Sequence, residues 1–159
     1  MFSQTSEYAL RVVVYLASID GLAATTSQIA AATRAPVGYL AKVLLSLSKA
    51  GILRTQRGLH GGSVLSRPAT QITVYDVIQS VDPIVRITSC PLGLTSHGVN
   101  LCPLHRRLDE AIASVEQAFR ASTIAELVAE PAASRPLGQV PTRPATGLVP
   151  LSVLDAEKS

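Results

Sequence analysis

The chain is poor in several residue types, and each shortage excludes a class of protein. It has no tryptophan, one methionine and two cysteines, and aromatic residues make up 4% of its 159 residues. Two cysteines are too few for a small fold held by disulfides, and in an intracellular protein they indicate metal or redox chemistry before a structural crosslink. No apolar run approaches the roughly 20 residues that span a bilayer, so we expect no membrane partner.

The beginning of the sequence also lacks the pattern of a secretory signal. Val12 to Ala17 is apolar, but no cluster of Lys or Arg precedes it. Glu7 and Arg11 lie where a signal peptide would be basic and then purely apolar. We therefore expect a cytoplasmic protein.

Charged residues make up only 16% of the chain, and the positive ones are concentrated in its first half. Residues 1–80 contain seven Lys or Arg against three acids, a balance of +4 within a formal net charge of +3, which leaves −1 for the remainder. A basic segment of this kind is typical of a protein that contacts nucleic acid.

Hydrophobic spacing in this basic half predicts three helices in close succession. The first is expected from Tyr8 to Ile19, and the second from Gln28 to Thr33, with candidate N-caps just before it. Pro36 suits a first helical turn, so the third helix is expected from Pro36 to Ala50. Its predicted core residues, at helical spacing, are Leu40, Val43, Leu44 and Leu47. The last two helices are a candidate helix-turn-helix.

The segment after the third helix predicts a β-hairpin. Ile52–Gln56 and Ser63–Ser66 have the pattern of short strands, and the glycine-rich Gly58–Gly62 between them allows a tight turn. Thr73 is a candidate N-cap for a further helix over Val74–Val81. A helix-turn-helix followed directly by a basic hairpin is a winged helix. We therefore expect a mainly α fold with a small β-wing, and a winged helix-turn-helix DNA-binding domain over residues 1–82.

The second half is predicted to contain a loop, a long helix and a tail. The loop spans residues 83–103 and contains Cys90, His97 and Cys102. A dimerisation helix is expected over residues 104–130, and it has a narrow apolar stripe that fits a partner helix from a second copy. The stripe consists of Leu104, Leu108, Ile112, Val115 and Phe119. Residues 131–159 are rich in Pro and Ala without periodicity, so we expect a flexible tail there.

Within the winged helix, the third helix is the candidate for insertion into the major groove of DNA. It lacks the Arg, Asn and Gln side chains that read bases through paired hydrogen bonds, so apolar contacts, DNA shape and the wing are expected to carry more of the specificity. Lys42 is alternatively a solvated residue, and Tyr39 fits core packing as well as DNA contact. The candidate DNA-binding residues are Val37, Gly38, Tyr39, Lys42, Arg57, His60 and Gly61.

The Cys and His residues of the second half form a candidate metal site. Pro103 is a natural first helical residue, which places Cys102 at the N-cap and His105 at the third helical position, where their side chains converge. Cys90 on the loop is a candidate third ligand. A structural zinc, a thiol–disulfide switch and a site without metal are alternatives. A zinc or thiol enzyme is not expected, because no acid–base carboxylate accompanies the loop.

The order of motifs resembles one family of regulators. Glu7-Tyr8-Ala9-Leu10-Arg11, Leu47–Leu53, Arg57–Gly62 and Ile72–Ile78, followed by the Cys-containing loop and the long helix, are similar to the IscR/NsrR-type regulators of the Rrf2 family. The resemblance covers residues 1–127. It implies a homodimer, joined through a helix over residues 104–127, that binds a palindromic operator in double-stranded DNA. It also implies a repressor that senses redox state, nitric oxide or iron through an iron–sulphur cluster.

The sequence departs from the family pattern at one cluster ligand. Many family members hold a cluster with three loop cysteines and one other residue, but Ser96 occupies the position of the middle cysteine. The candidate cluster ligands are therefore Cys90, Cys102, His105, His97 and Glu7. Glu7 is included because it matches an acidic ligand on the first helix of some family members. This mixed set favours a [2Fe-2S] cluster. Zinc held by Cys90, Cys102 and His105 is the alternative.

Overall fold

The described part of the chain comprises residues 2–58, 61–94, 100–131, 134 and 136–137 of a computed structural model. In chain order, its elements are α1 (Gln4–Ser18), α2 (Thr26–Thr33), α3 (Val37–Lys49), β1 (Leu53–Gln56), β2 (Gly62–Leu65), the 3-10 helix η1 (Ala69–Gln71), α4 (Val74–Val81), α5 (Pro103–Ala121) and α6 (Ile124–Ala129). This mainly helical fold with one two-stranded wing confirms the fold class expected from the sequence.

Side-chain caps determine where α1 and α2 begin. Helix α1 begins four residues before the predicted start at Tyr8, because Ser3 accepts a hydrogen bond from the amide of Ser6. Helix α2 begins with a capping box, in which the side chains of Thr25 and Gln28 each accept a hydrogen bond from the other's backbone N–H. Both starts are therefore determined by polar side chains rather than by the apolar spacing.

Backbone turns determine the two ends of α3. Arg34, in the left-handed conformation with φ 53°, turns the chain after α2, and extended Pro36 is the N-cap of α3. After Lys49, Gly51 with φ 70° directs the chain into β1. The helix is thus one residue shorter at each end than the predicted Pro36–Ala50.

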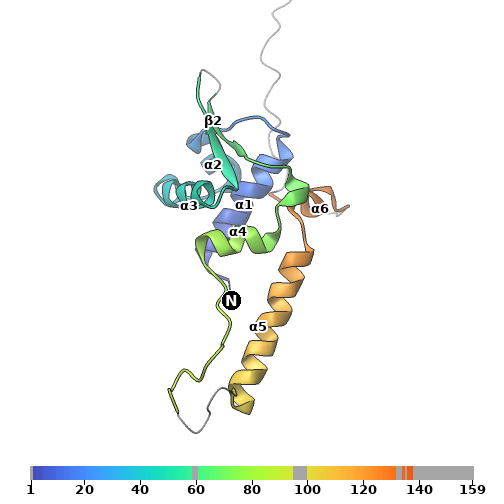
Figure 1. Cartoon of the computed structure of the whole chain (residues 1–159). Coiled ribbons are helices and arrows are strands. Elements are labelled where there is room, and N and C mark those ends of the chain that lie inside the picture. The colour runs from blue at the N-terminus through green and yellow to red at the C-terminus, as the bar shows by residue number, and fades with distance from the viewer. Residues whose placement is uncertain (1, 59–60, 95–99, 132–133, 135, 138–159) are drawn as a thin grey trace, which may run out of the picture.

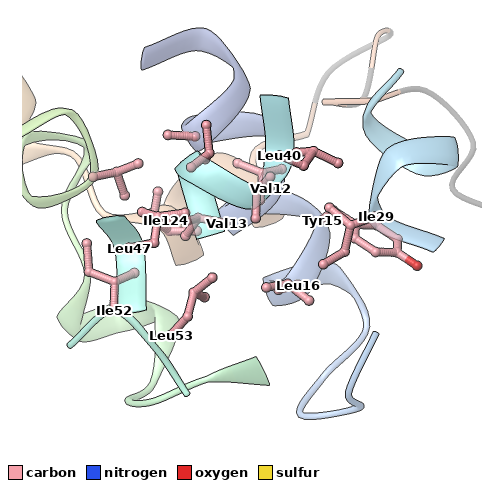
Figure 2. Packing of buried hydrophobic residues seen from close by; sticks show 14 of the residues in the cluster. Val12, Val13, Tyr15, Leu16, Ile29, Leu40, Leu47, Ile52, Leu53 and Ile124 are labelled. Carbon is pink, nitrogen blue, oxygen red and sulfur yellow. The ribbon is translucent and has the colours of Figure 1, made fainter. Parts of the chain in front are cut away.

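The core lies where α1 meets α2, α3, α4 and α6. Figure 2 shows its side chains, with Ile124 of α6 in the same cluster as Val13 of α1 and Leu47 of α3. Leu44, which was also expected in the core, is only half-buried. The largest fully buried side chains are those of Leu16, Ile29, Leu40, Leu47, Ile52, Ile72, Ile78, Ile124, Val12, Val13, Val43 and Val77.

The wing is an antiparallel hairpin that is tied to the helical domain at one edge. Leu53 of β1 lies opposite Leu65 of β2. On the other edge of β2, Ser63 and Ala24 exchange two backbone hydrogen bonds of 2.8 and 3.0 Å. Gly62 has φ 154°, and a Cβ there would lie 2.3 Å from the carbonyl oxygen of Ala24, so the close approach requires glycine.

Helix α5 is shorter than the helix expected over residues 104–130. It ends at Ala121, because Ser122 is extended and Thr123 caps a new helix, α6, in a capping box with Glu126. In Figure 1, α5 projects from the winged helix as an arm, and the described residues that follow α4 run alongside it toward its far end. The expected single helix is therefore two helices.

Helix α6 returns to the winged helix and anchors one end of α5. The backbone N–H of Val74 donates to Ser122, and that of Ile124 donates to Ile72. The side chain of Ile124 is fully buried in the core. The C-terminal end of the arm is therefore fixed to the domain.

Most of the segment expected as a flexible tail lies outside the described residues. Of residues 131–159, the structure describes 131, 134, 136 and 137, and Leu137 packs half-buried against the core. Within the part of the chain that is described, no helix combines the length and the apolar character needed to cross a membrane.

We expect Ile124→Ala to lower the free energy of unfolding by about 2–5 kcal/mol, because it removes a fully buried aliphatic side chain and leaves a cavity. Val128→Ala, one turn further along the same helix where the side chain is 36% exposed, is the control and should change stability by about 0.5 kcal/mol or less. Urea unfolding followed by circular dichroism measures both variants. Equally small effects would show that α6 is not anchored in the core.

Candidate functional site

Helix α3 has one face in the core and the opposite face in solvent. Leu40, Val43 and Leu47 are buried. Val37, Gly38 and Lys42, which were predicted to contact DNA, are exposed. Ala41, Leu45, Ser48 and Lys49 are also exposed. Because α3 contains two lysines and no acidic residue, this face is suited to a polyanion.

Tyr39, at the start of α3, is held against α1 although 40% of its surface is exposed. Its hydroxyl lies 2.7 Å from Oγ1 of Thr5, and its ring meets that of Tyr8 edge-on, with 5.5 Å between centroids. Tyr39 therefore fixes the N-terminus of α3 relative to the first turn of α1. The exposed part of its ring is accessible to a ligand, so both roles considered from the sequence are compatible with its position.

The wing adds further positive charge beside α3. Arg57, predicted at the wing, is exposed. The turn is closed by the Gly61 N–H, which donates to the carbonyl of Gly58 at 2.9 Å. A Cβ at Gly61 would lie 2.6 Å from the carbonyl oxygen of Gln56, so the turn itself accounts for this glycine. His60, the remaining predicted wing contact, lies outside the described residues.

Sequence reasoning missed two exposed residues on this surface. Leu45 on α3 is 55% exposed, and Arg54 on β1 is exposed next to buried Leu53. Leu45 follows Gly38 by seven residues, a spacing that places both on the same helix face. Arg54 has no comparable signal, because Ile52 and Leu53 are both buried and β1 is exposed throughout from Arg54 onward.

The first turn of α5 brings two candidate metal ligands together. Cys102 is the N-cap and makes no side-chain hydrogen bond to the helix backbone. Its Sγ lies 3.2 Å from Nδ1 of His105, and both residues are half-buried. A sulfur and an imidazole nitrogen at this separation are suited to binding the same soft or borderline metal ion.

The remaining candidate ligands are spread over the chain. Cys90 is half-buried on the loop before α5, and His97 lies outside the described residues. Glu7 belongs to α1, and Figure 1 shows the first turn of α5 at the end of the arm that is farthest from the winged helix. Among the described residues, no three His, Cys, Asp or Glu side chains gather as a metal site. The ligand role of each residue remains a prediction.

Glu7 is accessible at the surface of α1. Its carboxylate pairs with Arg11 at 2.9 Å, and its side chain is 55% exposed. A cavity of about 600 Å³ lies beside it, lined by residues of α1, by the end of α2 with Arg34, and by Pro136 and Leu137. A group from outside the chain can therefore reach Glu7 in competition with Arg11.

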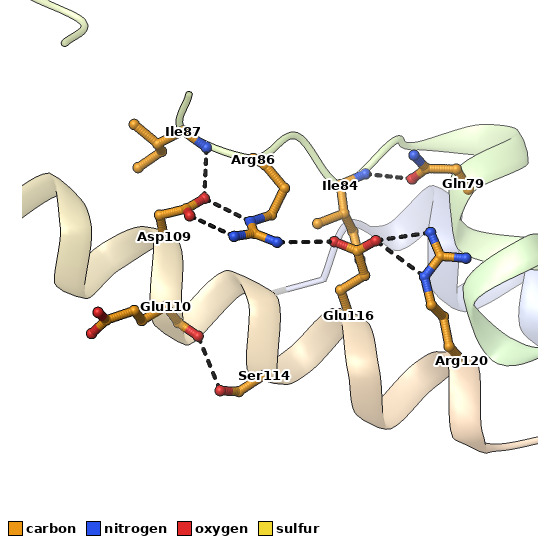
Figure 3. A network of polar contacts seen from close by, with 9 residues as sticks. All are labelled: Gln79, Ile84, Arg86, Ile87, Asp109, Glu110, Ser114, Glu116 and Arg120. Atoms are coloured by element: carbon orange, nitrogen blue, oxygen red, sulfur yellow. Dashed lines mark hydrogen bonds and ion pairs between the residues drawn. The ribbon is translucent and has the colours of Figure 1, made fainter. Parts of the chain in front are cut away.

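A network of ion pairs holds the loop against α5 (Figure 3). Arg86 on the loop donates to both carboxylate oxygens of Asp109, at 2.6 and 2.5 Å, and the Ile87 amide donates to the same carboxylate at 2.9 Å. Arg86 also lies 3.9 Å from Glu116, which pairs with Arg120 at 2.8 Å. The loop is thus attached to α5 through charged groups.

The two carboxylates of this network stay charged at neutral pH. The hydrogen bond from Arg86 lowers the pKa of Asp109, and the hydrogen bond from Arg120 lowers the pKa of Glu116. The pKa of each carboxylate is therefore lower in the folded protein than in the unfolded chain. The contribution of the network to stability is present above the unfolded values of about 4 and is lost as the pH falls through the lowered values.

Arg120 connects this network to the winged helix. Its guanidinium carbon lies 3.5 Å from the centroid of the Tyr75 ring on α4, a cation–π contact. Helix α4 packs in turn against α1 and α3. A continuous set of contacts therefore leads from the loop through α5 and α4 to the helices of the winged domain.

The fold and the charged outer face define a class of protein. A short helix, a second helix with a cationic exposed face and a directly following hairpin form a winged helix-turn-helix, which places α3 and the wing for contact with a DNA duplex.

Comparison with known proteins assigns the family. Residues 2–130 match the Rrf2 family, described as iron-dependent transcriptional regulator. The chain is 29% identical over 131 residues to a protein of Aquifex aeolicus (strain VF5) named as an HTH-type transcriptional regulator, and the match covers 80% of this chain and 91% of that relative. The chain therefore belongs to the Rrf2 family of DNA-binding transcriptional regulators, which are not enzymes.

Solved structures show the same fold. The CymR (YrzC) structure, the global cysteine regulator of B. subtilis, is 23% identical with a TM-score of 0.67, and the match covers 80% of this chain and 95% of that one. The structure of T. potens IscR is 21% identical with a TM-score of 0.66, and the match covers 80% of this chain and 85% of that one.

We expect Lys42→Ala to weaken binding to all DNA sequences and to reduce the slope of log K against log salt by about one, because one phosphate contact is lost. Arg106→Ala, exposed at the far end of α5, is the control of equal charge and should leave the slope unchanged. Fluorescence anisotropy across a salt series measures both. An unchanged slope for Lys42→Ala would place this residue away from the phosphates.

We expect Asp109→Ala to accelerate hydrogen exchange of the Ile87 amide several-fold, because its charged acceptor is lost. Glu110→Ala is the matched control, since Glu110 pairs only with the neighbouring turn through Arg106 and should leave Ile87 unaffected. Exchange followed by NMR tests the attachment of the loop. Equal rates in the two variants would show that Asp109 does not hold it.

Proposed function

We propose that this Rrf2 regulator is a dimeric repressor whose affinity for a palindromic operator is controlled at the far end of α5, through an iron–sulphur cluster of the [2Fe-2S] type. The observation that carries the proposal is the 3.2 Å approach of the Cys102 sulfur to the His105 imidazole at the first turn of that helix. A pair of ligands on a rigid helix start is suited to a site whose occupancy moves the helix.

The residues of this chain fit the cluster only as part of a larger set. Cys102 and His105 supply two ligands, and Cys90 and His97 are the further candidates of the loop. Glu7 lies in the winged helix, away from the far end of α5, so we propose that it reaches the site from a second copy of the chain. When bound, the cluster would supply a centre that responds to redox state, nitric oxide or iron.

The attachment of the loop supports a path from the proposed site to DNA. Arg86 fixes the loop to Asp109, and Arg120 fixes α5 to Tyr75 on α4. A change at Cys102 or nearby on the loop therefore acts on α5 and α4 together. In a dimer, a change in the angle of α5 would change the distance between the two α3 helices and so the fit to two operator half-sites.

The surface of α5 supports the homodimer. None of its residues is buried, and its apolar stripe includes Leu104 at 62%, Leu108 at 47% and Val115 at 39% exposure. An apolar stripe of this length on a projecting helix requires a partner surface. We propose that α5 of a second copy covers it, over Pro103–Ala121 instead of the full 104–127 segment expected from the sequence.

A second candidate uses the same residues without a cluster. Zinc bound by Cys90, Cys102 and His105, a switch between the thiols of Cys90 and Cys102, or a regulator without metal would each use this loop. The observation that favours this candidate is the same Cys102–His105 approach, because a thiolate and an imidazole are also ligands of zinc.

We expect protein purified without oxygen to be coloured, with visible absorbance that is lost in Cys102→Ala and Cys90→Ala, because each removes a proposed thiolate ligand. Arg107→Ala, exposed on the same turn of α5, is the control and should keep the absorbance. Ser96→Cys, which places a thiol at the position of the family's middle cysteine, should slow cluster loss in air. Absorption spectra and metal analysis measure all four variants.

A colourless anaerobic preparation with one zinc per chain would overturn the cluster and support the zinc candidate. A colourless, metal-free preparation that forms a reversible Cys90–Cys102 disulfide would support the thiol switch. A coloured wild type whose absorbance survives Cys102→Ala would remove the first turn of α5 from the site.

A further inference from the structure

The exposed face of α3 is apolar at its centre. Gly38, Ala41, Lys42 and Leu45 follow one another at spacings of three, one and three residues and so share one face of the helix. Leu45 exposes 55% of its surface, although the inward positions Leu40, Val43 and Leu47 are fully buried. The outward leucine is therefore not part of the core, and its exposure calls for a contact outside the domain.

This face has little capacity to read bases through hydrogen bonds. The helix contains no Arg, Asn, Gln, Asp or Glu, which leaves Tyr39, two lysines and two serines as its side chains able to hydrogen-bond a base edge in the major groove. Among the polar side chains of α3, that of Lys42 lies on the same helix face as Leu45. The one major-groove feature that an apolar side chain recognises is the C5-methyl group of thymine.

We propose that Ala41 and Leu45 form an apolar strip that selects operator sequences by contacting thymine methyl groups. The proposal rests on the placement of α3 in the major groove and names the base that this helix prefers. Ala41 and Leu45 are four residues apart, about 6 Å along the helix axis, which is close to two steps of roughly 3.4 Å along a DNA strand. The strip therefore contacts thymines that are neighbours or lie two positions apart in one half-site.

The small residues on the strip allow close approach of the helix to the bases. A Cβ built at Gly38 would have nothing within 4 Å, so neither packing nor backbone strain requires glycine there. Gly38 has no side chain and Ala41 has only a methyl group, so the backbone of the first turns of α3 is accessible. The longer side chain of Leu45 lies one turn further along. This profile suits a helix that enters a groove at its N-terminal end.

Charge indicates a nucleic acid as the occupant of this face. Lys42 lies directly beside the strip, Lys49 ends the helix, and Arg54 on β1 is exposed nearby in the chain. No acidic residue occurs in α3 or β1. Cations that surround an apolar strip match phosphates that flank base methyl groups.

The test compares thymine with uracil, which lacks only the methyl group. An operator is first selected from random DNA with the full-length protein, and each thymine is then replaced in turn by uracil. We expect a loss of affinity of about threefold to fivefold at one or two thymines of each half-site, the effect of one buried methyl group. Leu45→Ala should bind the thymine operator more weakly and show no uracil penalty at its own position.

Leu22→Ala is the matched control, because Leu22 is 54% exposed but lies in the turn before α2. It should keep both the affinity and the uracil penalties of the wild type. Because both leucines are exposed, each variant should keep the thermal stability of the wild type, which circular dichroism checks.

The outcomes separate this inference from the proposed regulator function. If no operator can be selected, sequence-specific repression itself is wrong. If an operator is selected but uracil costs nothing at any position, or if Leu45→Ala keeps every uracil penalty, the methyl-reading strip is overturned while the regulator stands. Unchanged DNA binding of Leu45→Ala would instead assign the exposed leucine to a protein partner.

Discussion

The relation between the two halves of the molecule depends on the burial of Ile124. Its side chain is fully buried in the core, and the backbones of Thr123 and Thr73 pair beside it, which fixes the C-terminal end of α5 to the winged helix. The other end of α5 has no buried residue and carries the Cys102–His105 pair. A helix of 19 residues is about 28 Å long, so a small change of angle at the anchored end becomes a displacement of several ångströms at the far end. The anchor therefore allows α5 to pivot about its C-terminal end.

The loop is attached to α5 by ion pairs, whereas the helices of the winged domain are held together by aliphatic packing. Arg86 is 42% exposed, and exposed ion pairs contribute little each to stability. Their geometry is nonetheless specific, because Arg86 binds both oxygens of Asp109 and the Ile87 amide joins them. Such an attachment orients the loop without the free energy that fixes Ile124. The weak contact lies between the loop that contains Cys90 and α5, which carries Cys102 and His105, so it is a contact that a change at the proposed site can alter.

The sequence predicted those features whose causes are local. The winged helix follows from apolar spacing, caps and glycines within short windows, and the approach of Cys102 to His105 follows from three-residue spacing at a helix start. The break after Ala121 was missed although a local signal marks it, because the helical spacing of the apolar stripe ends at Phe119 and Thr123 with Glu126 has the pattern of a capping box. The docking of Ile124 in the core, by contrast, depends on tertiary contacts that the apolar spacing does not reveal. The Arg86–Asp109 pair joins residues that are 23 positions apart and leaves no pattern in either segment.

The beginning of α1 contacts the proposed recognition helix and also carries the proposed ligand Glu7. Thr5 and Tyr8 hold Tyr39 at the start of α3, and on the same turn Glu7 pairs with Arg11. Arg11 also donates to the carbonyl oxygen of Thr33 at the end of α2, at 3.3 Å. A ligand that takes Glu7 from Arg11 would leave Arg11 bound to α2 and would act on the turn that holds Tyr39. The recognition helix would then respond at its N-terminus, the end that carries Gly38 and Ala41. If Ala41 and Leu45 contact methyl groups as proposed, such a shift would weaken binding, because a gap of about 0.5–1 Å already removes a quarter to a half of a van der Waals contact.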